Sequence, residues 1–330
     1  MTDPHPEAGS TMRAVEYDRY GAAEELQIRT VPRPTPKARE ALVRVVGTTI
    51  NPIDVSIRSG DMRILTGRKF PKRTGRDFTG EVIALGSGVN DLSTGQRVWG
   101  FLTGLSGRVG TAAEYITVRA TAVSSAPMTI DPVEAAALPS VGVTALHALR
   151  DVLRVRPGNR LLIVGASGGV GSVAIQLGVA MGAEVTAASS TANHDFCRGL
   201  GAADAVDYND PKEIHGEYDA VLDCHGTSLG SYRRLVRRGG RIMTLATRGM
   251  GFALRSAVSP GPRIRIMMAQ PRRADLAALS DYVDQKLIHP VVEETHPLEE
   301  ITHLHKLAAG GHGRGKRVLQ VTGHASAVTE

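Results

Sequence analysis

The sequence predicts an α/β protein in which a doubly wound parallel sheet is inserted into a second, mostly β, barrel-like domain. Three observations lead to this prediction. A strand, a glycine-rich turn and a helix follow one another over residues 160–182, strands and helices alternate from 131 to 289, and residues 12–125 carry strand patterns without helical periodicity. The chain has 330 residues, which is more than one typical domain, so two domains are expected.

The glycine-rich turn follows an apolar run at residues 161–164, as expected for a parallel strand buried on both faces. After it, apolar residues recur at helical spacing from Val170 to Met181, and residues 183–189 supply the next strand. The glycines let the backbone turn sharply and approach a ligand; they are Gly165, Gly168, Gly169 and Gly171. Strand, glycine turn and helix N-terminus form a dinucleotide-binding unit, with a purely structural turn as the alternative. The residues placed at the pyrophosphate are Ser167, Gly168, Gly169 and Val170.

The first domain is expected from short strand patterns separated by Gly, Pro and Asn/Asp turns. These strands lie at residues 12–17, 26–31, 41–50, 81–86, 95–100 and 113–118. Residues 31–36 are proline-rich and can neither continue a helix nor pair in a central strand. Residues 1–11 contain no apolar segment of the secretory kind and are expected to form a disordered leader.

The pattern changes near Asp131, where an N-cap residue, a proline and an acid in the first turn predict a helix start. Further helices are expected at 134–138, 141–153, 192–200, 229–236, 276–286 and 298–307. Further strands are expected at 205–208, 220–224, 241–245, 264–268, 291–294 and 316–321. We expect the last strand to return to the first domain. The predicted limits are therefore 12–125 with 290–330 for the β domain and 126–289 for the parallel-sheet domain.

Composition narrows the class of protein. The net charge is +6, and residues 224–274 contain eleven arginines but no Asp or Glu. This segment either attracts an anionic ligand or is a solvated basic face. Aromatic residues make up 4% and no nucleic-acid-binding module is recognised, so no nucleic-acid partner is expected. No apolar run reaches the ~18 residues of a membrane span. Two cysteines do not require an oxidising compartment, so a cytoplasmic location is predicted.

A series of motifs, taken in order, resembles one family. The longer ones are Asn-Pro-Ile-Asp at 51–54, Gly-Arg-Asp-Phe-Thr-Gly-Glu-Val at 75–82, Gly-Gln-Arg-Val at 95–98, Ala-Ser-Gly-Gly-Val-Gly at 166–171, Gly-Ala-Ala-Asp at 201–204 and Gly-Lys-Arg-Val-Leu at 315–319. Shorter ones lie at 58–60, 137–139, 144–146 and 176–177. The chain resembles the medium-chain dehydrogenase/reductase superfamily, in its zinc-independent NADPH:quinone oxidoreductase (zeta-crystallin-like) branch.

This resemblance implies that the first domain is GroES-like, that the second is of Rossmann type, and that the active site is the cleft between them. It also implies a homodimer that forms through edge strands near residues 264–268. The dimer is an expectation that comes from the family, because the residue pattern shows only that a short strand exists there.

A zinc site in the cleft is excluded by the ligands available. Zinc-dependent relatives place a Cys near Asn51 and a His-Glu pair at Arg76 and Asp77, whereas residues 1–146 here contain no Cys and only one His, His5. His303 and His305 lie two apart on a predicted helix, so they face different directions and are expected at the surface.

The end of the second strand indicates which cofactor binds. NAD sites place an Asp or Glu there, but this chain reads Ala-Ser-Ser-Thr-Ala at 188–192, without an acid before Asp195. The missing carboxylate removes repulsion against a 2′-phosphate, to which Ser189 and Ser190 can donate hydrogen bonds. NADPH is therefore the predicted cofactor.

Other cofactor contacts are implied by the resemblance. Related enzymes usually carry a Lys or Arg near the 2′-phosphate where this chain has His194, and Arg314 and Lys316 are candidates for the missing cation. Tyr208 matches a family position near the adenosine phosphate. The strand ends that would line the ribose-nicotinamide crevice are Asp223, Leu245, Ala246 and Thr247.

By the same resemblance, Asn51 and Thr144 lie close to the nicotinamide and the acceptor. The alternatives are that Asn51 is a turn residue before Pro52 and that Thr144 bonds its own helix backbone. His225 has the chemistry of a general acid but is more simply a structural residue after a strand.

The loop at residues 61–74 contains no Tyr, the proton donor of enoyl-thioester reductases on this fold. A quinone needs no dedicated acid, so the predicted activity is hydride transfer to a quinone or an α,β-unsaturated carbonyl compound. The alternatives are an enoyl reductase of a carrier-bound or biosynthetic intermediate, favoured by the basic segment, and a non-catalytic NADPH-binding protein.

Overall fold

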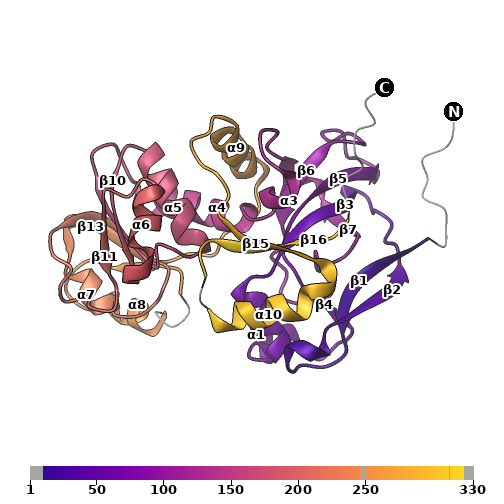
Figure 1. The fold of residues 1–330 in the computed structure, drawn as a ribbon, viewed down its shortest axis with the longest axis horizontal. Coiled ribbons are helices and arrows are strands. Elements are labelled where there is room, and N and C mark those ends of the chain that lie inside the picture. Colours follow the sequence, from indigo (N-terminus) through magenta and orange to yellow (C-terminus); the bar gives the residue numbers. More distant parts are fainter. Residues whose placement is uncertain (1–9, 247–249, 312, 323–330) are drawn as a thin grey trace.

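The structure is a computed structural model and describes residues 10–246, 250–311 and 313–322. Its strands form three sheets, of three, six and seven strands. Figure 1 shows the parallel sheet and the N-terminal sheets at opposite ends of an elongated molecule. Most of the predicted leader lies outside the described residues, but Thr11 already belongs to the first strand, β1 (Thr11–Tyr17).

The N-terminal part is built from two sheets that are antiparallel except for one parallel pair of strands, β15 and β16. β1 pairs with β2 (Gln27–Pro32) and with the short β4 (Lys72–Arg73). The larger sheet has the order β15-β16-β3-β5-β6-β8, and β7 pairs with β3. Its bounds are β3 (Glu40–Thr49), β5 (Asp77–Leu85), β6 (Arg97–Phe101), β7 (Tyr115–Arg119), β8 (Val123–Ser125), β15 (Val292–Pro297) and β16 (Lys316–Gln320). Alternating apolar residues of these strands enclose one core, as in a closed antiparallel domain.

The second sheet is parallel throughout and has the order β11-β10-β9-β12-β13-β14. Its strands are β9 (Arg160–Val164), β10 (Glu184–Ser189), β11 (Asp204–Asp207), β12 (Tyr218–Asp223), β13 (Val236–Thr244) and β14 (Ile264–Ile266). In chain order this is 3-2-1-4-5-6, the doubly wound arrangement, with the topological switch between β9 and β12. The α/β fold predicted from the sequence is confirmed.

Helices cover both faces of the parallel sheet. Leu161 and Ile163 pack in one core with α4 (Pro139–Leu146), α5 (Gly169–Ala180) and α9 (Arg273–Asp284). Leu162 and Val164 pack in another with α7 (Leu229–Arg233) and α8 (Met250–Ser256). Because successive residues of a strand point to opposite faces, a strand buried on both faces must be continuously apolar. Two shorter helices between residues 131 and 200 are α3 (Pro132–Ala135) and α6 (His194–Gly199).

Residues 12–125, predicted to be mostly β without helical periodicity, contain two helices that the prediction missed. Helix α1 (Pro52–Ser59) begins after Asn51, whose backbone N–H donates to Asp54 Oδ2 (2.9 Å), and ends at Gly60 with φ +92°. Proline at the first position, an acid at the third and a left-handed glycine at the end are helix signals. A short α2 (Arg63–Thr66) follows. Eight residues are too few for an apolar period to stand out.

The last strand returns to the N-terminal sheet. β16 pairs antiparallel with β3, with Val318 opposite Thr49, and β15 pairs in parallel with β16. Figure 1 shows this segment, in yellow, crossing from the parallel sheet to the N-terminal part. The exact domain limits stay a prediction.

The prediction for the histidine pair is wrong for one member. His305 on α10 (Ile301–Gly310) is fully buried, and its Nε2 lies 2.9 Å from Thr74 Oγ1. His303 is exposed. Residues two apart on a helix do face different directions, but α10 packs against α1, so one of the two directions is inward. Burial lowers the pKa of His305 to about 3, so the ring is neutral at ordinary pH.

Candidate active site

The glycine turn has no space for a side chain at Gly171. A Cβ on Gly171 would lie 2.3 Å from Gly165 O and 2.7 Å from Ala166 Cα, and Gly165 itself has φ +75°. Gly168 directly precedes α5, and Gly169 and Val170 form its first turn, so their N–H groups lie at the helix N-terminus. The turn lies at the switch point of the sheet, where doubly wound folds bind nucleotides. These residues fit a dinucleotide pyrophosphate.

The end of β10 carries the groups predicted for the adenosine side. Asn193 Nδ2 donates to Ser167 Oγ (3.2 Å) and Ser190 Oγ (3.1 Å), which ties this end to the glycine turn. Arg314 Nε donates to Asn193 Oδ1 (2.8 Å), so its guanidinium lies at the same place. Ser189 is fully buried and donates to Ser190 O (3.2 Å).

Two further residues flank this end. Within the described chain, His194 Nε2 is buried without a hydrogen-bond partner. An unpaired buried polar atom is costly unless a ligand satisfies it. The ring of Tyr208 lies 4.8 Å from that of His225, whose Nδ1 is 2.8 Å from Thr227 Oγ1. His225 is therefore an exposed residue held by its own loop. This loop runs beside the glycine turn, since an ideal Cβ on Gly165 would lie 3.5 Å from His225 Cβ.

Asp223, at the end of β12, is committed to the chain itself. It is fully buried and accepts hydrogen bonds from the N–H groups of His225 (3.0 Å) and Gly226 (2.9 Å) and from Thr244 Oγ1 (2.7 Å). These bonds hold the ends of β12 and β13 together, beside half-buried Leu245 and Ala246. Thr247 lies outside the described residues.

The structure separates Arg314 from Lys316, which were grouped as candidate cations for the 2′-phosphate. Gly315 between them has φ +65° and donates its N–H to Ser167 O (2.9 Å). A Cβ on Gly315 would lie 2.2 Å from Val291 O, so the left-handed turn requires glycine. The turn sends Arg314 to the end of β10 and Lys316 inward to Asn51. Lys316 is therefore not available to the 2′-phosphate.

Asn51 and Lys316 belong to a buried network centred on Asp77. Asp77 Oδ2 accepts from Thr49 Oγ1 (2.7 Å) and from Asn51 Nδ2 (2.8 Å). Ser140, in the first turn of α4, donates to Asp77 through its N–H (2.6 Å) and its hydroxyl (2.9 Å). Lys316 Nζ donates to Asn51 Oδ1 and lies 3.7 Å from Asp77 Oδ2. Four segments distant in sequence thus meet at one carboxylate.

Thr144 lies on α4, one turn after Ser140, and its hydroxyl donates to Ser140 O (2.6 Å). This is the bond to its own helix that the sequence left open as an alternative. The side chain is half-buried. Its hydroxyl keeps two acceptor lone pairs for a ligand.

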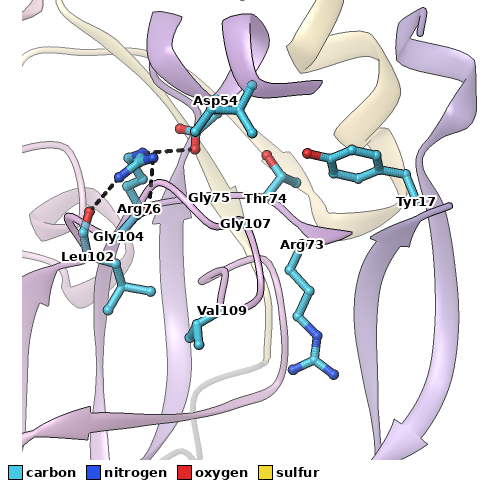
Figure 2. A pocket seen from close by; sticks show the side chains of 11 residues that line it. Tyr17, Asp54, Arg73, Thr74, Gly75, Arg76, Leu102, Gly104, Gly107 and Val109 are labelled. Atoms are coloured by element: carbon cyan, nitrogen blue, oxygen red, sulfur yellow. Dashed lines mark hydrogen bonds and ion pairs between the residues drawn. The ribbon is translucent and has the colours of Figure 1, made fainter. Parts of the chain in front are cut away.

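A small pocket is lined by Asp54, Arg76, Tyr17 and Thr74, among others, as Figure 2 shows. Arg76 Nε lies 3.3 Å from Asp54 Oδ1, and the guanidinium donates to Leu102 O (3.0 Å) and Gly104 O (3.2 Å). Burial raises the pKa of Asp54 to about 6, although Arg76 acts in the opposite direction. Burial, with the Asp54 charge, also raises the pKa of Tyr17.

Several cations in the loop at 61–74 and in the basic segment 224–274 have structural partners. Lys72 is fully buried and donates to Thr66 O and Ser106 O (2.8 Å each). The arginines of residues 224–274 that bond to carbonyls or carboxylates include Arg233, Arg234, Arg237, Arg241 and Arg273. These partners favour a structural basic face over a single anion site.

Sequence reasoning missed Asp77 and Ser140. Arg76 and Asp77 were considered only as replacements for zinc ligands. The one signal was a charged residue at the start of β5, a strand whose only other charged residue is Glu81. In the described residues no group of three or more His, Cys, Asp or Glu is placed to hold a metal, and no helix is long and apolar enough to cross a membrane.

Comparisons with known proteins agree with this geometry. Residues 37–128 match the alcohol dehydrogenase GroES-like domain, and residues 200–319 match the zinc-binding dehydrogenase family. The chain is 31% identical over 330 residues to a chloroplast envelope quinone oxidoreductase homolog of Arabidopsis thaliana, covering 95% of this chain and 99% of the relative. It is 29% identical to a mitochondrial NAD(P)H oxidoreductase, RTN4IP1, of Drosophila melanogaster, covering 96% and 88%.

The solved structure of a quinone oxidoreductase from Coxiella burnetii superimposes with a TM-score of 0.88 at 29% identity, covering 95% of this chain and 100% of that one. The names of the relatives contradict the predicted cytoplasmic location, since they are a chloroplast envelope and a mitochondrial protein. That prediction rested on a missing secretory signal and few cysteines, which argue against an oxidising compartment but do not distinguish among reducing ones.

The two sheets of the fold, the glycine turn and the similarity over the whole chain therefore all indicate the same family. The chain belongs to the medium-chain dehydrogenase/reductase superfamily, in its quinone oxidoreductase branch, and is a nicotinamide-dependent oxidoreductase.

Proposed function

We propose that this enzyme is a zinc-independent, NADPH-dependent reductase of quinones or α,β-unsaturated carbonyl compounds. The observation that supports it most is the segment 314–316, which brings Arg314 to the end of β10 and Lys316 to Asn51. Residues 314–316 thus link the site proposed for the adenosine phosphate to the side-chain amide of Asn51, which lies beside the glycine turn. Bound NADPH would supply a hydride, and the protein would orient the acceptor.

Zinc independence is supported by the chemistry of the residues that stand at the zinc positions. Arg76 carries no lone pair for a metal and is bonded to Asp54 and two carbonyls. Asp77 accepts from Thr49, Asn51 and Ser140. A tetrahedral zinc site needs thiolates, imidazoles or free carboxylates, and this donor set offers none.

The activity is tested by following NADPH oxidation with a small quinone, a simple enone and a crotonyl thioester. We expect turnover of the quinone or the enone and none of the thioester. The loop at 61–74 lacks Tyr, and the nearby Tyr20 hydroxyl is already bonded to Thr66 and Gly67. Turnover of the thioester alone would instead indicate an enoyl reductase. Tight NADPH binding without any turnover would indicate a binding protein.

Arg314 should decide between NADPH and NADH. Replacing it with alanine removes the cation at the end of β10, so the affinity for NADPH should fall about 10- to 100-fold, as for a lost charge-assisted hydrogen bond. The affinity for NADH should not change. Both are measured by fluorescence titration. Arg29→Ala, on the N-terminal hairpin and paired with Asp18, is the control. An equal loss for both cofactors would refute the assignment.

We also propose a homodimer through β14, the last strand of the parallel sheet among those described. Large apolar side chains are exposed around it, including Leu254 (69%), Ile266 (46%) and Met268 (69%). Exposed edges with apolar neighbours are sites of pairing. Ile266→Glu should convert a dimer into a monomer in light scattering after gel filtration, whereas Ile64→Glu, on α2, should not. A monomeric wild type would contradict the proposal.

A further inference from the structure

Lys316 is a buried cation that the reaction as proposed does not yet use. It is the first residue of β16, and its side chain is 9% exposed. Its ammonium donates to Asn51 Oδ1 and lies 3.7 Å from Asp77 Oδ2, which is fully buried. A buried charge without a partner is strongly unfavourable, so the ion pair with Asp77 keeps this ammonium in place.

The two charged neighbours determine how the Asn51 carboxamide is oriented. An ammonium can only donate and a carboxylate can only accept. Lys316 must therefore face Oδ1 of Asn51, and Asp77 must face Nδ2, which is the arrangement found (2.8 Å for Asn51 Nδ2 to Asp77 Oδ2). Nδ2 carries a second N–H that the Asp77 bond does not use. Without Lys316, only the bond to Asp77 would hold the orientation of the amide.

The lysine side chain also passes the glycine turn. Gly315 and Gly168 form a parallel bridge, and an ideal Cβ on Gly169 would lie 3.0 Å from Lys316 Cδ. The aliphatic part of Lys316 thus runs beside the turn that receives the cofactor pyrophosphate, and its ammonium ends at Asn51. This contact places Asn51 within one lysine length of the nucleotide site.

We infer that Lys316 is a positioning residue that holds the Asn51 carboxamide with an N–H available to the carbonyl oxygen of the acceptor and keeps a positive charge beside it. The inference rests on the proposed function. In a conjugated acceptor, the hydride would come with its electron pair from a C–H bond of bound NADPH, leaving NADP⁺, and would form a new C–H bond at the β-carbon. The C=C π pair would then shift toward the carbonyl carbon and the carbonyl π pair would move to oxygen. The Asn51 N–H and the nearby ammonium stabilise the resulting oxyanion, which then takes a proton from water.

The ionisation of Lys316 gives this inference a signature. Burial lowers the pKa of Lys316 below its ordinary value of 10.5, although Asp77 and Asp54 oppose the shift. The ammonium is the active form, so kcat should fall as the pH rises through this lowered pKa. In Lys316→Arg the guanidinium stays charged, and the alkaline fall should disappear.

The test compares Lys316→Met, Lys316→Arg and the surface control Lys306→Met, in which an exposed lysine paired with Glu24 is lost. Lys316→Met should lower kcat about 100-fold, as expected when a donor that stabilises an oxyanion is lost. Its Kd for NADPH, from fluorescence, should stay close to wild type. Lys316→Arg should recover much of the loss. In NMR spectra of the protein without cofactor, the ¹⁵Nζ signal of Lys316 is the lysine signal that is absent from the Met variant. The pKa measured from this signal should lie below 10.5.

The outcomes separate this inference from the proposed function. A wild type that reduces no acceptor refutes the proposed function, whereas the ¹⁵N titration still tests the ionisation of Lys316. If the wild type is active and Lys316→Met has the same kcat and the same fall of kcat at high pH, the role of Lys316 is refuted. If Lys316→Met does not fold, the charge-neutral pair Lys316→Met with Asp77→Asn replaces it, and kcat of that pair equal to wild type refutes the role.

Discussion

Replacing Asp77 with leucine should lower the free energy of unfolding by about 3–5 kcal/mol, the cost of removing one partner from a buried ion pair. The leucine would leave the Lys316 ammonium without its counter-charge. It would also leave the Ser140 N–H and the Thr49 hydroxyl without their acceptor in a buried site. Unfolding in urea, followed by the fluorescence of Trp99 on the neighbouring strand β6, measures the change.

Two variants make the Asp77 result specific. Asp77→Asn keeps an acceptor oxygen and should cost less than leucine, because only the charge is lost. Asp18→Ala removes an exposed partner of Arg29 and should leave stability nearly unchanged, because exposed ion pairs contribute little. A cost for Asp77→Leu no larger than that of Asp18→Ala would mean that the network contributes nothing to stability.

Replacing Gly171 with alanine should abolish cofactor binding and destabilise the protein by about 1–3 kcal/mol, the usual cost of overpacking. The added Cβ would lie 2.3 Å from Gly165 O and 2.7 Å from Ala166 Cα, and both are backbone atoms of the same turn. Alanine is otherwise favoured over glycine in a helix by up to ~1 kcal/mol, so a net loss must come from the clash. Fluorescence titration with NADPH and thermal unfolding give the two values.

Gly168→Ala is the matched control in the same turn. Its Cβ would meet no atom closer than 3.5 Å, at Gly165 O, which is an ordinary contact. The stability of Gly168→Ala should therefore stay near that of wild type. If Gly171→Ala were as stable as Gly168→Ala, the turn would be able to open without cost, and the close packing would not explain why glycine stands at 171.

Local patterns were sufficient for much of the fold. The apolar run at 161–164, the glycines after it and the following helical spacing encode β9, the turn and α5, because each signal lies within about 20 residues. The returning strand β16 and the helix start at Asp131 were also expected, and Asp131 accepts from Val133 N (2.7 Å) as an N-cap should. One expected helix, at 141–153, changes into a π-helix from His147, whose ring lies 2.6 Å from Asp275 on α9.

The alternation of elements, the glycine turn and the lack of thiol and imidazole ligands at the zinc positions follow from the amino-acid sequence alone, since periodicity, backbone freedom and residue chemistry are local properties. Which polar residues meet depends on the three-dimensional packing of the chain. This packing buried His305 because α10 packs on α1, and it divided Arg314 from Lys316 because Gly315 turns left-handed. It joined positions 51, 77, 140 and 316 at one carboxylate, because a buried charge selects its partners by position in space and not by distance along the chain.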